Sequence, residues 1–151
     1  MAKGSVLRKV EIAPQGEAVP VPPLRLDIGC GKTTPEGWEG VDAIDFGQKH
    51  VHDVRKGMPW LADNSVDEVR SSHFVEHLTG TERIAFFNEL WRICKHGATG
   101  LIIIPDATKS GAFSDPGHKS FYSKDIFNFI SKKSMASNKA SGTSCTEYPL
   151  E

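Results

Sequence analysis

The chain has 151 residues, of which 18 are Lys or Arg and 19 are Asp or Glu, and its formal net charge is −1. A chain of this length can bury one hydrophobic core, and its near-neutral charge excludes the broad basic surface of a general nucleic-acid binder. Its three cysteines are far apart and form no disulfide framework or C-x-x-C metal pair, and no apolar run approaches the roughly 20 residues of a membrane span. We therefore expect a cytoplasmic protein.

The two ends of the chain differ in composition from its middle. Four prolines between residues 14 and 23 interrupt regular structure, because proline fixes φ and lacks a backbone N–H. Residues 135–151 are polar and rich in Ser, Lys, Asn and Thr, so they have little to bury. We predict an extended arm over residues 1–23, a folded domain over residues 24–134 and a disordered tail over residues 135–151.

The segment Leu24–Ile28 is a short apolar run that leads into Gly29-Cys30-Gly31. This pattern predicts a buried parallel strand and then a tight turn, where glycine permits positive φ and the close approach of a ligand. Asp27 lies at the carboxyl end of the predicted strand. Open α/β sheets bind their ligands outside such ends, so the sequence places a candidate ligand site here.

Two common glycine-loop motifs fit this turn in all but one position. The dinucleotide-binding motif G-x-G-x-x-G has Thr34 in place of its last glycine, and the phosphate-loop motif G-x-x-x-x-G-K-[ST] has Leu26 in place of its first. The run Leu26–Gly31 instead resembles the first motif of class I, Rossmann-like S-adenosylmethionine-dependent methyltransferases, in particular type 11-like members. The resemblance implies that this loop binds the cofactor through Asp27, Gly29, Cys30 and Gly31.

Three further strands are predicted at residues 38–42, 50–54 and 65–69. The first connection is shorter than the dozen or so residues of an ordinary parallel crossover, so we expect its helix to be reduced to a turn. Asp42 ends the second strand and matches the family's acidic residue that binds the ribose hydroxyls. Asp53 matches the carboxylate that accepts from the adenine amino group. Both roles are implied by the resemblance.

The residues His73, Glu76 and His77 spell H-x-x-E-H, a zinc-protease pattern. On a helix the two histidines would share one face and could bind one metal ion, although the sequence identifies no third protein ligand. The same segment, Ser71–Leu78, also resembles the one that follows the fourth strand in the methyltransferases. That resemblance places Ser72 and His73 beside the cofactor and substrate.

Residues 81–96 are predicted as an amphipathic helix, with Thr81 as N-cap and Gly97 just beyond its end. Its apolar stripe has helical spacing and is predicted to face the core: Ile84, Phe87, Trp91 and Cys94. A continuous apolar run at residues 100–104 predicts a buried fifth strand. A second helix is expected at residues 124–133.

A long polar loop runs from Pro105 towards Tyr122, and in the family this segment approaches the acceptor. Asp106, His118 and Tyr122 are its candidate orienting or acid–base groups. If the acceptor is a hydroxyl or an amine, His73 or His118 is the candidate general base.

Together these patterns predict an α/β fold, with a Rossmann-like, mainly parallel sheet of about five strands flanked by helices and without the family's C-terminal antiparallel hairpin. The resemblance implies a methyltransferase that uses S-adenosyl-L-methionine, with His73, Asp106 and His118 at the transfer site and no metal ligand assigned. The acceptor is an unidentified small molecule or macromolecule, with neither membrane nor nucleic acid indicated. The open sheet edge could pair with a second copy of the chain.

Two other functions remain compatible with these residues. The first is a catalytically incomplete S-adenosylmethionine-binding module of the same fold, since it would share every motif before Ile104. The second is a zinc-dependent hydrolase that uses His73, Glu76 and His77.

Overall fold

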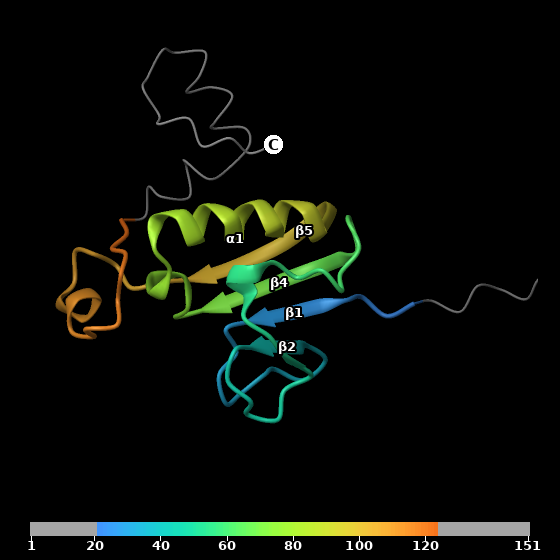
Figure 1. Cartoon of the computed structure of the whole chain (residues 1–151), viewed down its shortest axis with the longest axis horizontal. Coiled ribbons are helices and arrows are strands. Elements are labelled where there is room, and N and C mark those ends of the chain that lie inside the picture. The colour runs from blue at the N-terminus through green and yellow to red at the C-terminus, as the bar shows by residue number, and fades with distance from the viewer. Residues whose placement is uncertain (1–20, 124–151) are drawn as a thin grey trace, which may run out of the picture.

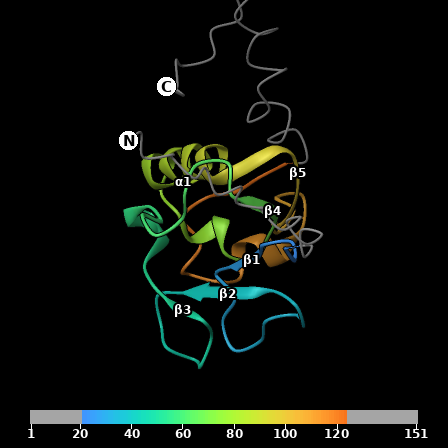
Figure 2. The same ribbon diagram turned by 90° about the vertical axis from the view of Figure 1, so that its right-hand side faces the viewer.

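Five parallel strands form one sheet in the spatial order β3-β2-β1-β4-β5 (Figures 1 and 2). The structure is a computed structural model, and it describes residues 21–123. The strands are β1 (Arg25–Ile28), β2 (Glu39–Asp42), β3 (His50–Val51), β4 (Val66–Ser72) and β5 (Cys94–Ile103). The chain leaves β1 towards β2 on one side and later returns to β4 on the other, which creates a crevice at the carboxyl ends of the strands. The predicted Rossmann-like α/β fold is confirmed.

The connection between β1 and β2 contains no helix. Residues 29–38 form turns only, and the Gly29 N–H donates to the Val41 carbonyl over 2.8 Å. This bond lets the chain turn back beside β1 without the helical crossover that parallel strands usually need. The prediction of a reduced first crossover is confirmed.

Two predicted strands have different lengths in the structure. β3 comprises His50–Val51 only, because Val54 begins the 3₁₀ turn η1 (Val54–Lys56). β4 continues to Ser72 instead of ending near Val69, because its last residues keep pairing with β5. Ser72 is therefore a strand residue opposite Ile103.

The helix α1 (Gly80–Ile93) begins earlier than predicted, with Thr79 and not Thr81 as its N-cap. The Thr79 Oγ1 accepts from the Glu82 N–H, and a Glu82 carboxylate oxygen accepts from the Thr79 N–H over 2.8 Å. This reciprocal pair is a capping box. The helix also ends at Ile93 instead of His96, because β5 starts directly at Cys94.

The buried face of α1 matches the predicted stripe only in part: Phe87 and Cys94 pack half-buried against the core, but other residues are its buried centre. Phe86, Leu90 and Ile93 are buried in the core, whereas Trp91 is 45% exposed. The buried side chains belong to one cluster with Leu26 and other residues of the sheet. In Figure 1 the helix lies along the β4–β5 half of that sheet. Apolar residues occur on both sides of α1, so contact with the sheet decides which of them are buried.

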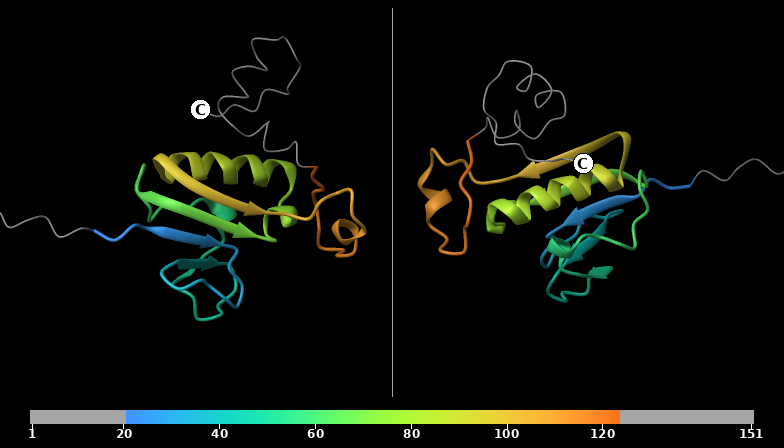
Figure 3. Two further views of the ribbon diagram at one scale, coloured as in Figure 1. Left: turned by 180° about the vertical axis from the view of Figure 1, so that it is seen from behind. Right: turned by 45° about the horizontal axis from the view of Figure 1, so that its top comes forward.

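The strand β5 is an edge strand and not a buried one. Leu101 and Ile103 are 53% and 38% exposed, and no other strand of the described residues pairs with β5 on its outer side. Side chains alternate between the two faces of a strand, so Leu101 shares a face with its partner Arg70. The prediction of a buried fifth strand is therefore wrong. Figure 3 shows this half of the sheet from behind.

Some predictions fall on residues outside the described range. They are the helix at residues 124–133, the tail at residues 135–151, most of the arm at residues 1–23, and the missing C-terminal hairpin. None of the helices within residues 21–123 combines the length and apolar character that a membrane crossing requires.

Candidate functional site

A cavity of about 320 Å³ lies at the carboxyl ends of the strands. Figures 1 and 3 show β1, β4 and β5 pointing to one side of the molecule, where the loop of residues 105–123 also lies. The cavity is large enough for a small ligand. Its walls come from five segments at or after strand ends: Gly29 after β1, residues 41–43 at the end of β2, residues 52–55 after β3, Phe74, His77 and Leu78 from the turn after β4, and Gly117 and Lys119 from the loop after β5.

Asp42 lies on the cavity wall at the end of β2. One carboxylate oxygen accepts from the Gly31 N–H over 2.9 Å, and the other accepts from the Ile44 N–H over 3.0 Å. These bonds hold the carboxylate in one orientation and tie it to the glycine turn. Each carboxylate oxygen has two acceptor positions, so each keeps one position for a ligand hydroxyl.

The two glycines of the turn serve different purposes. Gly29 has φ +68°, and a Cβ built on it would lie 2.5 Å from the Phe74 ring, so a side chain here is excluded by the protein itself. Gly31 has φ +58°, and a Cβ there would meet no atom within 4 Å. The space in front of Gly31 is therefore open, and the approach of a ligand there stays a prediction.

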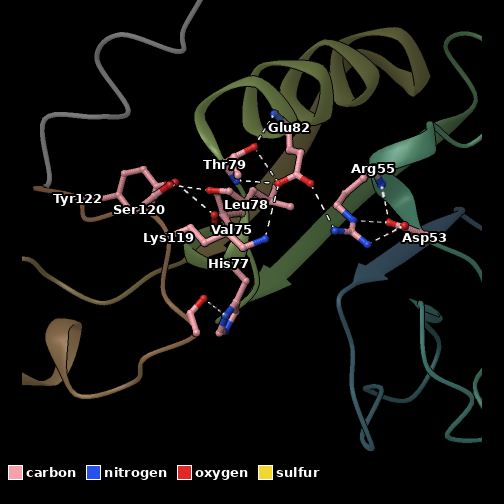
Figure 4. A network of polar contacts seen from close by, with 11 residues as sticks. Asp53, Arg55, Val75, His77, Leu78, Thr79, Glu82, Lys119, Ser120 and Tyr122 are labelled. Atoms are coloured by element: carbon pink, nitrogen blue, oxygen red, sulfur yellow. Dashed lines mark hydrogen bonds and ion pairs between the residues drawn. The ribbon is translucent and has the colours of Figure 1, made fainter.

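Asp53 also lines the cavity, but its carboxylate already has partners. It accepts from the Arg55 backbone N–H at the start of η1 and from two nitrogens of the Arg55 guanidinium, each over 2.8 Å (Figure 4). These Arg55 hydrogen bonds hold the pKa of Asp53 below its usual range. A ligand amino group would have to share this carboxylate with Arg55.

The Asp53–Arg55 pair extends into a larger charged network across the cavity (Figure 4). Arg55 Nη1 donates to Glu82 Oε1 over 3.3 Å, and Lys119 Nζ lies 4.0 Å from Glu82 Oε2. Arg55 and Lys119 both line the cavity, so two cations face a ligand there. Sequence analysis missed both, and their only sequence signal is their place in loops that follow strands.

Asp27 is placed away from the cavity wall. Its side chain is fully buried in the sheet, where Oδ1 lies 2.6 Å from Arg70 Nη1 on the neighbouring strand. Burial raises the pKa of Asp27, and the hydrogen bond from Arg70 opposes that rise. Its Oδ2 has no hydrogen-bond partner among the described residues. Its role as a cofactor ligand stays a prediction.

Two further predicted cofactor residues lie next to the cavity without lining it. The Cys30 thiol is half-buried in the glycine turn, 3.5 Å from the Gly31 carbonyl oxygen, and burial raises its pKa. Ser72 is half-buried at the last position of β4. Phe74, two residues later, is the side chain that reaches the cavity from this segment, and sequence analysis missed it.

The predicted catalytic residues His73, Asp106 and His118 and the further candidate Tyr122 lie in different environments. The His118 ring is largely buried, with Nδ1 2.7 Å from the Ala112 carbonyl. His73 follows β4 with φ +53°, and its largely exposed ring has Nδ1 3.2 Å from Glu76 Oε1. Asp106 is exposed and accepts from the Thr108 N–H. Tyr122 is buried in the core, and its hydroxyl accepts from Arg83 and donates to the Val75 carbonyl. Tyr122 is thus held in a structural role.

The H-x-x-E-H segment does not form the helix that a shared histidine face requires. Only Val75–His77 is helical, as the single 3₁₀ turn η2, and His73 lies outside it in the left-handed region. The structure instead brings His118 to His77, with ring centroids 5.0 Å apart. The proposed pairing of His73 with His77 is therefore wrong.

Comparison with solved structures finds a similar protein. The crystal structure of a SAM dependent methyltransferase from Archaeoglobus fulgidus matches with a TM-score of 0.62 and 26% sequence identity, over 72% of this chain and 58% of that one. The chain thus spans less than two thirds of that protein. No protein-family profile and no curated protein matches the sequence. Taken with the five-stranded parallel sheet, the similarity shows that the chain has the Rossmann-like fold of a class I S-adenosylmethionine-dependent methyltransferase.

Proposed function

We propose that the chain binds S-adenosylmethionine in the cavity and transfers its methyl group to an acceptor. The observation that carries the proposal is the carboxylate of Asp42, held on the cavity wall by the N–H of Gly31. The solved structure to which the chain is similar is described as a SAM dependent methyltransferase. The fold, the glycine turn and the carboxylate therefore support the same ligand.

The described residues fit an adenosyl group in four respects. Asp42 has the free acceptor positions that two neighbouring ribose hydroxyls need, and the open space before Gly31 lets a ligand reach the backbone. Phe74 supplies an apolar ring on the same wall. Asp53 and Arg55 together offer an acceptor and donors for the polar edge of a base.

When bound, the cofactor supplies a methyl group on a positively charged sulfur. Asp42 and the glycine turn would hold its ribose, and an acceptor's nucleophilic atom would displace the methyl group from sulfur and leave S-adenosylhomocysteine. The protein's contribution is then to hold the reactants in line, which can lower a barrier by roughly 7–11 kcal/mol in favourable cases. A hydroxyl or amine acceptor also loses a proton, for which the exposed ring of His73 is the candidate base.

A binding module without catalysis is the second candidate. It is favoured by the position of His73, which is largely exposed and is not among the residues that line the cavity. A module of this kind would use the cavity and Asp42 to bind the cofactor without transferring its methyl group.

Calorimetric titration of the full chain with S-adenosylmethionine and with S-adenosylhomocysteine tests the proposal. We expect one binding site for each compound. Release of S-adenosylhomocysteine in the presence of hydroxyl, amine or thiol acceptors then identifies an enzyme, whereas binding without release across the panel identifies the module. Absence of binding to both compounds would contradict the proposed function.

A further inference from the structure

The turn η2 and the loop that contains His118 are held together by backbone hydrogen bonds. The N–H groups of Lys119 and Ser120 both donate to the Glu76 carbonyl, over 2.8 and 3.1 Å. The Ser120 hydroxyl also donates to the Leu78 carbonyl over 2.6 Å. Figure 4 shows the two segments side by side. Their side chains therefore meet in a defined arrangement, although they lie about 40 positions apart in the sequence.

Three potential metal ligands meet where these segments join. One carboxylate oxygen of Glu76, one ring nitrogen of His77 and one ring nitrogen of His118 all lie within 4.8 Å of one another. A tetrahedral zinc ion with ligand distances near 2.0–2.1 Å needs about 3.3 Å between ligand atoms. Small side-chain movements would bring the three atoms to that spacing.

Both histidines are oriented as metal ligands usually are. His77 Nδ1 lies 3.1 Å from the Gly117 carbonyl, and His118 Nδ1 lies 2.7 Å from the Ala112 carbonyl. A carbonyl oxygen only accepts hydrogen bonds, so each Nδ1 must carry the proton. Nε2 is then the nitrogen of each ring that can bind a metal, and His118 Nε2 also lies 3.7 Å from Oδ2 of the exposed Asp115. Donation from Nδ1 to a backbone carbonyl is the usual support of a ligating histidine.

The Glu76 carboxylate supplies an independent observation. Its residue is 1% exposed, and its Oε2 has no hydrogen-bond partner among the described residues. Its other oxygen lies 3.2 Å from His73 Nδ1. A buried carboxylate oxygen without a partner is costly, and a bound cation would remove that cost.

We propose that Glu76, His77 and His118 bind one divalent metal ion of the zinc class. Two imidazole nitrogens and one carboxylate oxygen form a donor set that zinc accepts, with a fourth position left for water or another ligand. The ion links η2 to the loop of residues 105–123. His77 and Gly117 also line the cavity, so the metal orders one of its walls.

This set of ligands differs from that of the H-x-x-E-H motif, because His118 replaces His73 as the second histidine. The inference also goes beyond the proposed methyl transfer and does not depend on cofactor binding. A metal at His118 occupies that ring and leaves His73 as the base candidate.

The test uses the full chain, freed of metal with a chelator and then dialysed against Zn²⁺ or Co²⁺. We expect one retained equivalent by elemental analysis, and for Co²⁺ the intense visible absorption of a four-coordinate site. His118→Ala and His77→Ala should each weaken metal binding by at least about tenfold, because even supporting residues of a metal site carry effects of that size. The matched control is His96→Ala, which removes an exposed histidine of β5 and should retain the metal.

His73→Asn separates the two possible ligand sets, since it removes the imidazole of the H-x-x-E-H motif but keeps a side-chain donor for Glu76 Oε1 and suits the positive φ of this position. Retention of one equivalent supports the proposed site, and its loss would overturn it. Two other results would overturn it as well: His118→Ala binds the metal as tightly as the wild-type chain, or the wild-type chain retains far less than one equivalent. Circular dichroism of each metal-free variant shows whether a loss of binding reflects unfolding. If His118→Ala is unfolded, thermal unfolding of the wild-type chain and of His77→Ala replaces it. The proposed site predicts that the metal raises the Tm of the wild-type chain and raises that of His77→Ala much less, and an equal rise would overturn it.

Discussion

Asp42 joins the glycine turn to the cavity through a single carboxylate. We predict that Asp42→Ala weakens binding of S-adenosylhomocysteine by at least about tenfold, since a hydrogen bond to a charged group contributes roughly 1.5–3 kcal/mol. Titration calorimetry measures the change. The matched control is Asp45→Ala, because Asp45 is an exposed acid of the same loop whose carboxylate accepts from the Gly47 N–H. Equal affinity of the wild type and Asp42→Ala would remove Asp42 from the site.

The two glycines of the turn should respond differently to the same substitution. Gly29→Ala should lower the free energy of unfolding by about 2–5 kcal/mol, because it combines a positive φ with overlap against the Phe74 ring. Gly31→Ala meets only the backbone strain, about 1–2 kcal/mol, but places a methyl group where the ligand approaches. Urea unfolding and cofactor titration of both variants separate these effects. A Gly31→Ala variant with unchanged affinity would show that the ligand does not approach this residue.

The start of α1 depends on Thr79, which sequence analysis placed outside the helix. We predict that Thr79→Ala lowers the free energy of unfolding by about 1 kcal/mol, because the capping box loses its side-chain acceptor. Thr81→Ala, two residues later, should change it by less than about 0.5 kcal/mol. Urea unfolding compares the two. A larger loss in Thr81→Ala would mean that the helix begins where the sequence pattern first suggested.

Glu89 connects α1 to the segment after η1. It accepts from the Met58 N–H over 2.6 Å and receives two hydrogen bonds from Arg92, which hold its pKa below the usual 4.5. Because the folded pKa is lowered, this stabilisation is present above about pH 4.5 and is lost as the pH falls through the folded pKa.

Glu89→Gln should therefore lower the free energy of unfolding at pH 7 by about 1.5–3 kcal/mol, and the difference from wild type should vanish in acid. Unfolding at a series of pH values measures it. Asp63→Asn is the control, since Asp63 is an exposed partner of the same arginine and should cost about 0.2–1 kcal/mol. A difference for Glu89→Gln that stays constant with pH would show that the carboxylate charge is not the cause.

Among residues 21–123, the sheet ends in β3 on one side and β5 on the other. Leu101 is more than half exposed on β5, and an open strand edge can pair with another chain. We predict that the chain self-associates through β5, and that Leu101→Lys shifts it towards monomer in sedimentation velocity. Val51→Lys places the same charge on β3 and should leave the association unchanged. A monomeric wild-type chain at high concentration would contradict the prediction.

Local patterns were enough to predict the strands around Leu26, Val41 and Val66, their parallel arrangement and the missing first crossover helix. Apolar runs, glycines and connection lengths act over a few residues, so they can be read from the chain directly. The same reasoning placed Asp42 correctly at the end of a strand. It misplaced the start of α1, because it took Thr81 as the N-cap and overlooked the capping-box spacing Thr79-x-x-Glu82, which the contacts of Glu82 show to be formed.

Element type and order, the glycine turn and the position of Asp42 thus follow from the sequence, because they depend on neighbouring residues. The packing of residues distant in the chain decided the rest: Leu90 faces the sheet while Trp91 does not, Arg70 takes the carboxylate of Asp27, and β5 lies at an edge. It also brought His118 to His77 and Glu76. No spacing pattern encodes such meetings, since they arise only when the loop of residues 105–123 folds back over the turn after β4.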